Sequence, residues 1–242
     1  MAEFRLEIAG QVAAVTSLFE STPHHFSKYL TERDADFSIA VQPADLRFEQ
    51  EDADAEAAEE GFRQRNFPDP FLERAAILRK FAERLLEQDT ILLHGSTLAL
   101  NGKGYLFTGR SGTGKSTHTR LWREVFGENV QMVNDDRPFV QFTAAGITVW
   151  GSPWSGKHGL DTNIHVPLAG ICLLDRGTEN VIRPAQPAEL KELLKGFRPQ
   201  TPQQAARYES LLEDILRYTP LWQLSCTKDP EAAKVAFEAM SK

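Results

Sequence analysis

Residues 96–118 read STLALNGKGYLFTGRSGTGKSTH, and this stretch decides the fold class. Its second half, Gly109-Arg110-Ser111-Gly112-Thr113-Gly114-Lys115-Ser116, matches G-x-x-x-x-G-K-[ST] in full. The apolar segments on either side of Asn101-Gly102 predict two strands joined by a tight turn, because this dipeptide tolerates positive φ at both central positions. The second strand leads directly into the glycine-rich segment. A helix is expected from about Lys115 to Phe126, ended by Gly127.

The glycine-rich segment has the composition of a loop that binds phosphate. Glycines let the main chain wrap tightly, so several N–H groups point inward, and the following helix presents its positive end to the same anion. Lys115 can reach the β- and γ-phosphates, and the Ser116 hydroxyl can ligate Mg²⁺. The alternative is a glycine-rich turn that only caps a helix. It is disfavoured because a strand precedes the motif and a helix follows it. We therefore expect nucleotide contacts from Gly109, Arg110, Ser111, Gly112, Thr113, Gly114, Lys115, Ser116 and Thr117.

An acidic pair follows the next predicted strand. Asp135 and Asp136 come after Val130–Val133, 20 residues beyond Lys115. One carboxylate can hold Mg²⁺, and the other can accept the proton of an attacking hydroxyl. The alternative is a solvated acidic turn. Adjacent strand residues point to opposite faces, so both carboxylates can serve one site only if they lie in the loop beyond the strand.

Two further residues are candidates for the same site. Lys157 lies in the segment Gly151–His158, whose proline and glycines predict a loop, and it could act as a second cation on the transferred phosphate or the substrate. The alternative is an exposed loop lysine. His94 lies in the strand predicted at Ile91–Leu100, which pairs with the strand entering the glycine-rich loop. It is therefore either a residue near the phosphate or an ordinary strand histidine.

The composition excludes several classes of protein. The 242 residues carry a formal net charge of −7, whereas nucleic-acid or membrane-surface binding usually needs a basic face. No apolar run reaches the roughly 20 residues that span a bilayer, and the N-terminus shows no secretory signal. Cys172 lies in an apolar run and is expected to be a buried thiol. We expect a cytoplasmic protein with no nucleic-acid or membrane partner.

Patterning divides the chain into three zones. Residues 1–88 predict a small α+β region, a candidate partner or substrate surface; residues 89–183 predict a P-loop core; residues 184–242 predict a mostly helical region packed on that core. The first zone is expected to contain strands at Phe4–Ile8, Asp36–Val41 and Leu46–Phe48, an acidic loop or short helix at Glu49–Glu60, and a helix at Phe71–Gln88. Helices are expected in the last zone at Pro187–Lys195, at Pro202–Arg217 and from Asp229-Pro230 to Met240.

Three segments together carry a resemblance to a known group. His94-Gly95-Ser96-Thr97-Leu98, then Gly109–Ser116, then Val133-Asn134-Asp135-Asp136 resemble the His-containing strand, P-loop and Asp-Asp strand end of the HPr kinase/phosphorylase and phosphoenolpyruvate carboxykinase group. More closely, His94–Lys157 resembles the short HPr-kinase-like proteins of bacterial peptide-modification systems, whose Pro-Trp-x-Gly-Lys loop is similar to Pro153–Lys157. The resemblance implies an α/β fold with mixed sheets around a P-loop entered from a β-hairpin, a small α+β N-terminal region and a helical C-terminal region.

The resemblance also implies an activity and its residues. It implies an ATP- and Mg²⁺-dependent kinase that phosphorylates a hydroxyl of a peptide, protein or small molecule. Ser116 and Asp136 would hold the metal, and Asp135 would be the base. Lys115, Lys157 and His94 would complete the catalytic set. The sequence itself leaves open which aspartate has which role, and Thr117 stands where HPr kinases usually have Glu.

An alternative of a different class stays open. The chain could be a nucleotide-binding regulatory or adaptor subunit of a modification system, with little turnover of its own. Two further expectations come from the resemblance alone, namely reversal of the reaction by phosphate or pyrophosphate and assembly into a homo-oligomer. HPr itself is disfavoured as the acceptor, because the chain shows no clear counterpart of the C-terminal segment with which HPr kinases dock it.

Overall fold

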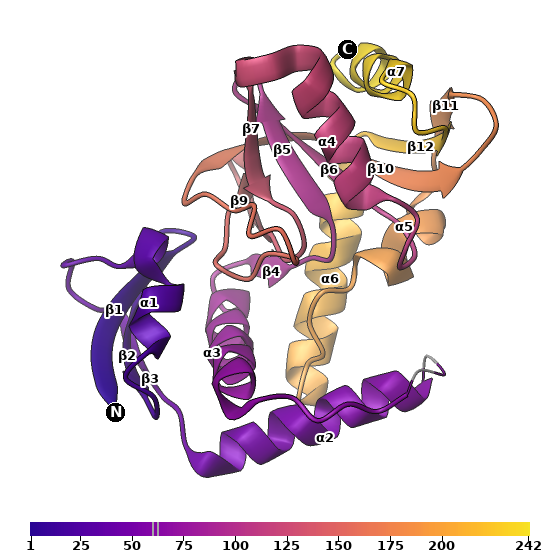
Figure 1. Cartoon of the computed structure of the whole chain (residues 1–242). Coiled ribbons are helices and arrows are strands. Elements are labelled where there is room, and N and C mark those ends of the chain that lie inside the picture. Colours follow the sequence, from indigo (N-terminus) through magenta and orange to yellow (C-terminus); the bar gives the residue numbers. More distant parts are fainter. Residues whose placement is uncertain (60, 62) are drawn as a thin grey trace. The chain divides into compact units, whose positions relative to one another are not determined.

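The computed structural model describes residues 1–59, 61 and 63–242 (Figure 1). The chain forms two compact units, Met1–Arg84 and Leu85–Lys242. Helix α3 (Asp69–Leu86) runs through the boundary between them. Within the described part of the chain, no helix is both long and apolar enough to cross a lipid bilayer.

The first unit is built on a three-stranded sheet. β1 (Ala2–Ile8) and β2 (Gln11–Ser17) are antiparallel, and β3 (Phe37–Ala40) pairs with β2 in parallel. The turn between β1 and β2 has positive φ at both Ala9 and Gly10, as a two-residue hairpin turn requires. A short α1 (Thr22–His25), a 3-10 turn at Ser27–Tyr29, α2 (Pro43–Glu59) and most of α3 complete the unit. Its buried apolar residues include Leu6, Ile8, Val12, Val15, Phe26, Ile39, Leu72, Ile77 and Phe81.

Helix α2 replaces a strand that the sequence predicted. The strand expected at Leu46–Phe48 is wrong, because these residues lie inside α2. Asp45 caps the start of this helix by accepting a hydrogen bond from the Gln42 N–H at 2.8 Å. The acidic stretch is helical through Glu59, as its Ala and Glu content favours. Glu60, the last residue of that predicted stretch, lies outside the described residues.

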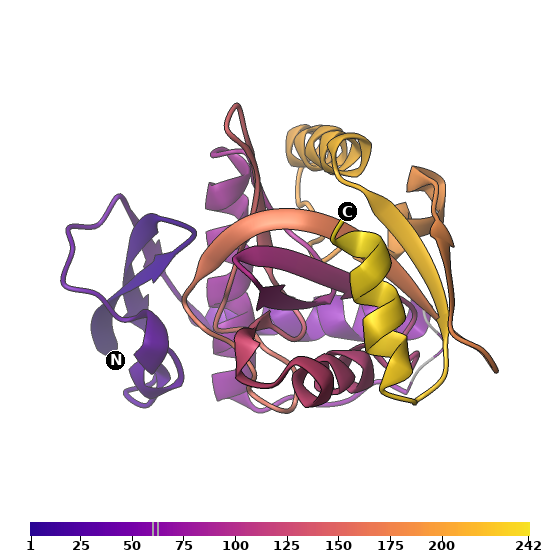
Figure 2. The same cartoon turned by 90° about the horizontal axis from the view of Figure 1, so that it is seen from above.

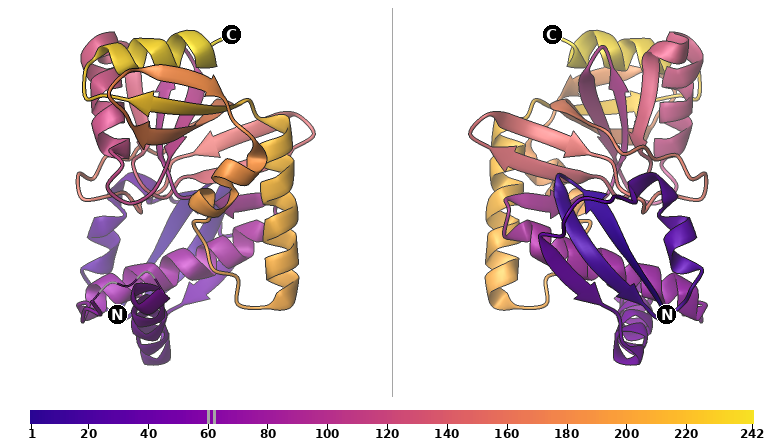
Figure 3. Two further views of the ribbon diagram at one scale, coloured as in Figure 1. Left: turned by 90° about the vertical axis from the view of Figure 1, so that its right-hand side faces the viewer. Right: turned by 90° about the vertical axis from the view of Figure 1, so that its left-hand side faces the viewer.

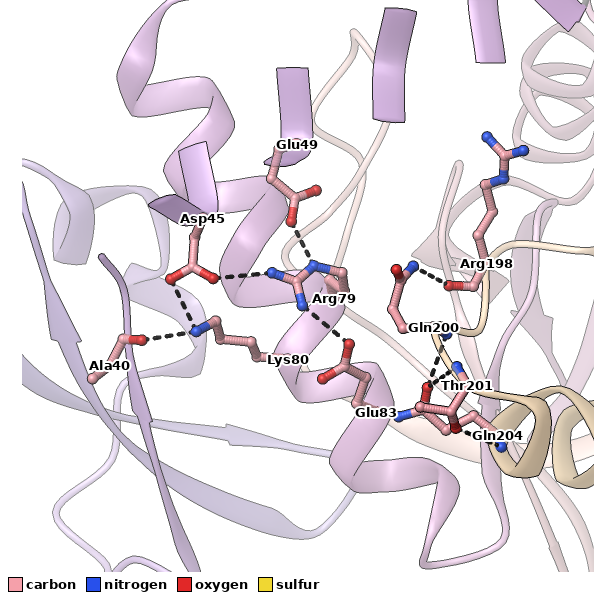
Figure 4. A network of polar contacts seen from close by, with 10 residues as sticks. All are labelled: Ala40, Asp45, Glu49, Arg79, Lys80, Glu83, Arg198, Gln200, Thr201 and Gln204. Carbon is pink, nitrogen blue, oxygen red and sulfur yellow. Dashed lines mark hydrogen bonds and ion pairs between the residues drawn. The ribbon is translucent and has the colours of Figure 1, made fainter. Parts of the chain in front are cut away.

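An arginine on α3 fixes α2 in place. The Arg79 guanidinium contacts Asp45 at 3.1 Å, Glu49 at 2.7 Å and Glu83 at 3.1 Å (Figure 4). It also lies over the Phe48 ring, 4.6 Å from the centroid. These partners are up to 34 residues away in sequence, so a local pattern around residue 46 could not reveal them.

The second unit is built on a sheet that has nine strands within the described residues. The path runs β4 (Thr90–Leu92), β8 (Phe139–Thr143), β9 (Gly146–Trp150), β10 (His165–Arg176), β6 (Lys103–Thr108), β5 (Ser96–Leu100) and β7 (Val130–Asn134). β12 (Leu221–Cys226) joins β10 in parallel and carries β11 (Val181–Pro184) on its other side. Since β6 and β10 are also parallel and the other pairs are antiparallel, the sheet is mixed.

Helices cover both faces of this sheet (Figures 2 and 3). α4 (Lys115–Phe126) and α7 (Glu231–Met240) share a core cluster with Tyr105 and Phe107 of β6. α5 (Pro187–Leu194) and α6 (Pro202–Tyr218) share another with Leu106 between them. Alternate residues of β6 therefore serve opposite cores, as strand periodicity dictates. The expectation of a mixed α/β fold is confirmed.

Three details of the second unit differ from expectation. The strand predicted at Ile91–Leu100 is interrupted, with β4 and β5 separated by residues 93–95. The apolar run that contains Cys172 is only the middle of a longer strand, β10, which extends over His165–Arg176. The last zone contains a strand in addition to its predicted helices, because β12 lies between α6 and α7 and pairs with β10. β12 has few fully buried residues of its own, so its strand identity comes from a partner about 50 residues upstream.

Candidate functional site

The glycine-rich loop, residues 109–114, connects the end of β6 to the start of α4. Its three glycines have φ values of +152° at Gly109, +75° at Gly112 and +108° at Gly114. A Cβ at Gly109 would lie 2.9 Å from the Leu174 carbonyl oxygen and 2.9 Å from the Thr113 hydroxyl. Both the main-chain conformation and the space therefore require glycine at this position.

The loop ends at the N-terminus of α4 without a side-chain cap. Gly114 is the N-cap residue in a left-handed conformation, and no side chain there accepts a hydrogen bond. The first intrahelical bond runs from the His118 N–H to the Gly114 carbonyl at 2.8 Å. The N–H groups of the preceding residues have no partner within the helix, and the helix dipole favours an anion beside them.

Lys115 folds back across the loop. Its ammonium group donates a hydrogen bond of 2.9 Å to the Gly109 carbonyl, six residues earlier. Burial lowers the pKa of this lysine, Asp136 opposes that change, and Arg137 adds to it. Lys115 thus lies within electrostatic range of residues from the turn that follows β7.

A second cation reaches the loop from β10. Because β10 is parallel to β6, with Leu173 opposite Thr108, its carboxyl end lies beside the start of the loop. The Arg176 guanidinium, at that end, donates to the Gly112 carbonyl. Arg176 was not among the residues predicted for the site. The sequence shows Asp175-Arg176 directly after an apolar run. Only the pairing of β10 with β6 shows that this strand ends beside the glycine-rich loop.

Asp135 is the more buried member of the acidic pair, with 4% of its surface exposed. One carboxylate oxygen, Oδ1, accepts a hydrogen bond of 2.6 Å from the Gly156 N–H. The other, Oδ2, is buried with no hydrogen-bond partner among the described residues. Burial raises the pKa of this carboxyl; the charges of Asp136 and Asp161 add to the effect, while the Gly156 N–H and His158 oppose it.

Asp136 faces a different neighbour. Its Oδ1 lies 3.7 Å from Nε2 of His94, and its main-chain carbonyl accepts a 3.0 Å bond from the Gly95 N–H. Burial, together with Lys115 and Arg137, lowers the pKa of His94 to about 4, against the opposing effect of Asp136. His94 is therefore neutral at pH 7 and can act as a hydrogen-bond donor through one ring nitrogen.

Both aspartates lie beyond β7, whose last residue is Asn134. That position removes the restriction that adjacent strand residues point apart. The two carboxylates nevertheless diverge, since Asp135 contacts Gly156 and Asp136 faces His94. The structure thus gathers His94, Lys115, Asp135 and Asp136 around one region, with different surroundings for each acid.

Asn134 links the turn that carries the acidic pair to the loop 151–158. It is fully buried, and its amide nitrogen donates to the Ser152 carbonyl at 2.8 Å, with the Ser152 hydroxyl at 3.0 Å and the Trp154 carbonyl at 3.3 Å. Its amide oxygen accepts bonds from the N–H groups of Asp136 at 2.7 Å and Arg137 at 2.6 Å. The sequence showed this asparagine beside the acidic pair but gave no reason to assign it a role.

The remaining predicted residues lie around this centre. Ser116 and Thr117 are half-buried in the first turn of α4, whereas Arg110 and Ser111 are exposed. Lys157 is also exposed, and within the described chain it forms no hydrogen bond or ion pair, although its neighbour Gly156 touches Asp135. The structure brings Lys157 to the edge of the site rather than into contact with the other candidates.

Magnesium would have two suitable oxygen donors here. Among the described residues, no group of three or more His, Cys, Asp or Glu side chains could hold a metal ion alone. Mg²⁺ in nucleotide sites needs only one or two protein ligands, because phosphates and water complete its shell. The Ser116 hydroxyl and the Asp136 carboxylate are oxygen donors of the required kind; the Asp136 side chain is 39% exposed, and its ion-pair contacts are 3.7 Å long.

A separate hollow lies elsewhere in the second unit. It has a volume of about 750 Å³ and is lined by parts of α5, α6 and β12, including Pro187, Leu216 and Trp222. No predicted site residue contributes to its wall. It is therefore not the site that the sequence predicted.

Comparison with known proteins finds similarity among solved structures alone. No family model matches the sequence, and no curated protein matches it. Among solved structures, the chain is similar to the HPr(Ser) kinase/phosphatase from Coxiella burnetii, at 13% sequence identity and a TM-score of 0.30. The match covers 51% of this chain and 88% of that one. A similarity at this level carries no argument about function, and the site residues rest on their own geometry.

Proposed function

We propose that this protein is a kinase that uses Mg²⁺–ATP to phosphorylate a hydroxyl of a peptide, protein or small-molecule acceptor. One observation carries the proposal. A loop with three positive-φ glycines ends at an uncapped helix N-terminus, and the lysine at that point interacts electrostatically with Asp136 in the turn that follows β7. A polyphosphate with a metal ion needs these two sets of groups in one place.

The nucleotide would bind along the glycine-rich loop, which is then a P-loop entered from the β5–β6 hairpin. The loop N–H groups and the helix dipole would hold the phosphates, and Lys115 would leave the Gly109 carbonyl to neutralise the β- and γ-phosphates. Arg176 and the nucleotide-facing residues from Gly109 to Thr117 would flank the same anion. ATP is proposed as the nucleotide from the family resemblance, because no residue here is assigned to the base.

Magnesium would be held by Ser116 and Asp136. When bound, the ion would neutralise charge on the β- and γ-phosphates and help align the transferred group. His94, which is neutral at pH 7 and lies beside Asp136, would donate a hydrogen bond to a phosphate oxygen. Lys157 would supply the second cation if the loop that carries it closes on the transferred phosphate.

Asp135 would act as the base. The acceptor oxygen bonds to the γ-phosphorus while the bond from that phosphorus to the β–γ bridging oxygen breaks, so ADP leaves and the hydroxyl proton passes to Asp135. The raised pKa of Asp135 and its unpaired Oδ2 suit a proton acceptor. Because Oδ2 is buried, a local shift must open a path to Oδ2 while the Gly156 N–H keeps its hydrogen bond to Oδ1.

Isothermal titration with Mg²⁺–ATP, combined with release of labelled γ-phosphate, tests the proposal. Lys115→Ala should weaken binding, and both Lys115→Ala and Asp135→Ala should lower turnover by about 10²–10³-fold, since each removes a preorganised charged group. Asp135→Ala should keep most of the binding. Arg120→Ala is the matched control, because Arg120 is an exposed residue of α4 paired with Glu124. Near-wild-type turnover of both variants, or no magnesium-dependent nucleotide affinity, contradicts the proposal.

A second candidate has one observation in its favour. The Gly156 segment covers Asp135 in this structure, and a covered base favours a nucleotide-binding regulatory or adaptor subunit with little turnover. Tight Mg²⁺–ATP binding by the wild-type chain without phosphoryl transfer to water or to any acceptor tested would support this candidate over the kinase.

A further inference from the structure

We infer that Asn134 is a positioning residue that holds the acidic turn, residues 135–137, and the loop 151–158 in one fixed geometry, so that Gly156 contacts Asp135. The inference rests on the proposed function, because positioning has a catalytic meaning only if Asp135 receives the proton. No sequence motif assigned this role. The inference depends on a buried side chain that bonds to two separate segments of main chain.

The contacts of Asn134 are divided between these two segments. Its amide oxygen accepts from the N–H groups of Asp136 and Arg137, which fixes the turn that displays both acids. Its amide nitrogen donates across 18 residues to the Ser152 carbonyl and lies 3.3 Å from the Trp154 carbonyl, which fixes the first half of the loop. Because Asn has both an acceptor and donors, one side chain serves both segments.

The loop is held to the turn by a second link and by a close approach. The Ser152 hydroxyl donates to the Arg137 carbonyl at 2.5 Å. Further along, a Cβ at Gly156 would lie 3.3 Å from both oxygens of Asp135, tighter than a normal contact. Gly156 therefore permits its own N–H to reach the carboxylate. The Asn134 link fixes where the loop starts, and glycine lets it reach Asp135.

The connection is selective for one side of the site. Each side-chain hydrogen bond found for Asn134 goes to the acidic turn or to the loop 151–158. The bonds that shape the glycine-rich loop involve Arg110, Thr113 and Lys115 instead. Loss of Asn134 should therefore disturb the geometry of Asp135 and leave the phosphate-binding loop intact.

The test combines amide hydrogen exchange by NMR with nucleotide titration on the full-length chain. In Asn134→Asp, the side chain keeps its acceptor for Asp136 and Arg137 but loses the donor to the loop. The Gly156 amide should exchange about tenfold faster, while the Asp136 amide keeps its protection. In Asn134→Ala, both amides should lose protection. A purely structural role would change protection throughout the second unit instead.

Gly156→Ala gives an independent variant that leaves Asn134 untouched. Its added methyl group should displace the 156 amide from Asp135 and reduce the release of labelled phosphate from Mg²⁺–ATP by about tenfold or more. Asn134→Asp should show a similar loss of turnover, while its dissociation constant for Mg²⁺–ATP stays within about twofold of the wild-type value because the glycine-rich loop is unchanged.

The outcomes separate this inference from the proposed function. Unchanged protection of the Gly156 amide in Asn134→Asp, in a chain that binds Mg²⁺–ATP, overturns the positioning role alone. Failure of the wild-type chain to bind Mg²⁺–ATP overturns the proposed function and the catalytic meaning of Asn134 with it, whatever the amides show. The predicted amide pattern together with the split between turnover and affinity supports both.

Discussion

Two strand ends build the candidate site, and they are constructed in different ways. At the end of β6, the hydrogen bonds that Thr113 and Lys115 make within the glycine-rich loop join residues three to six positions apart, and Arg176 of β10 adds one long-range bond to Gly112. At the end of β7, Asn134 bonds 18 residues away and Asp135 bonds 21 residues away. The first end is shaped by the conformational freedom of its own glycines, and the second is shaped by a distant loop packed against it.

The two ends also share an electrostatic property. Burial lowers the pKa of Lys115 and His118 on the α4 side, and it raises the pKa of Asp135 on the β7 side. In each case the charged form is disfavoured by removal from water. A site with this property strengthens the interaction of any charge that is later brought into it. Variants at the two ends should therefore show how much of the stability depends on local main-chain conformation and how much on the burial of ionisable groups.

The largest effect on stability is expected at Gly109. Gly109→Ala should lower the free energy of unfolding by about 1–3 kcal/mol from the main-chain conformation alone. The contact with the Leu174 carbonyl adds to this loss. Gly102→Ala is the control, because its φ is +73° but no atom lies within 4 Å of the added Cβ. Chemical denaturation should show the larger loss for Gly109→Ala; equal losses would contradict the close packing of the loop against β10.

A pH-dependent effect on stability is expected at His118. This residue is buried, accepts a 3.0 Å hydrogen bond from the Trp122 indole, and has its pKa lowered by burial to about 4. The unfolded chain binds the proton more readily, so stability is complete above about pH 6.5 and falls as the pH drops towards 4. Each such histidine contributes a slope of up to about 1.4 kcal/mol per pH unit.

His118→Gln should reduce this acid slope, because glutamine keeps an acceptor for Trp122 without titrating. Denaturation curves measured from pH 7 to pH 4 supply the test. His94, whose pKa is also lowered to about 4, remains in the variant and preserves part of the slope. A slope identical to that of the wild-type chain would contradict the expectation that the pKa of His118 is lower in the folded state than in the unfolded state.

The smallest effect is expected at Asp135, and it has the opposite sign. Its pKa is raised in the folded state, so the folded chain holds this proton more tightly than the unfolded chain. That contribution is present at acid pH and is lost as the pH rises through the folded pKa. Asp135→Asn should therefore raise the melting temperature at pH 7 and lose this advantage below the usual aspartate range. A lower melting temperature at pH 7 would contradict the burial of the charge.

The sequence predicted the glycine-rich loop well because its information is local. The bounds of α4, Lys115–Phe126, agree with the prediction, and Gly127 follows them with positive φ. The pairing of β5 with β6 across Asn101-Gly102 also follows from local turn chemistry. The predicted roles of Lys115, Ser116, Asp135, Asp136, Lys157 and His94 stay predictions, since no comparison with a known protein tests them.

Other elements could not be predicted because their causes are distant. Helix α2 was mistaken for a strand around Leu46–Phe48, where Arg79 of α3 supplies the stabilising ion pairs. Strand β12 was missed because it is stabilised by pairing with β10, and the residues of β12 alone do not indicate that pairing. Arg176 and Asn134 were left without roles for the same reason, since each contacts a segment that only folding brings near.

The sequence by itself determined a mixed α/β chain with a tight glycine turn at a helix start, because backbone freedom and strand or helix periodicity are properties of neighbouring residues. Only the tertiary structure decided that Asp135 is covered by Gly156 and that Asp136 faces His94. These environments come from chain segments that meet after folding, and it is burial among them that separates one acid from the other.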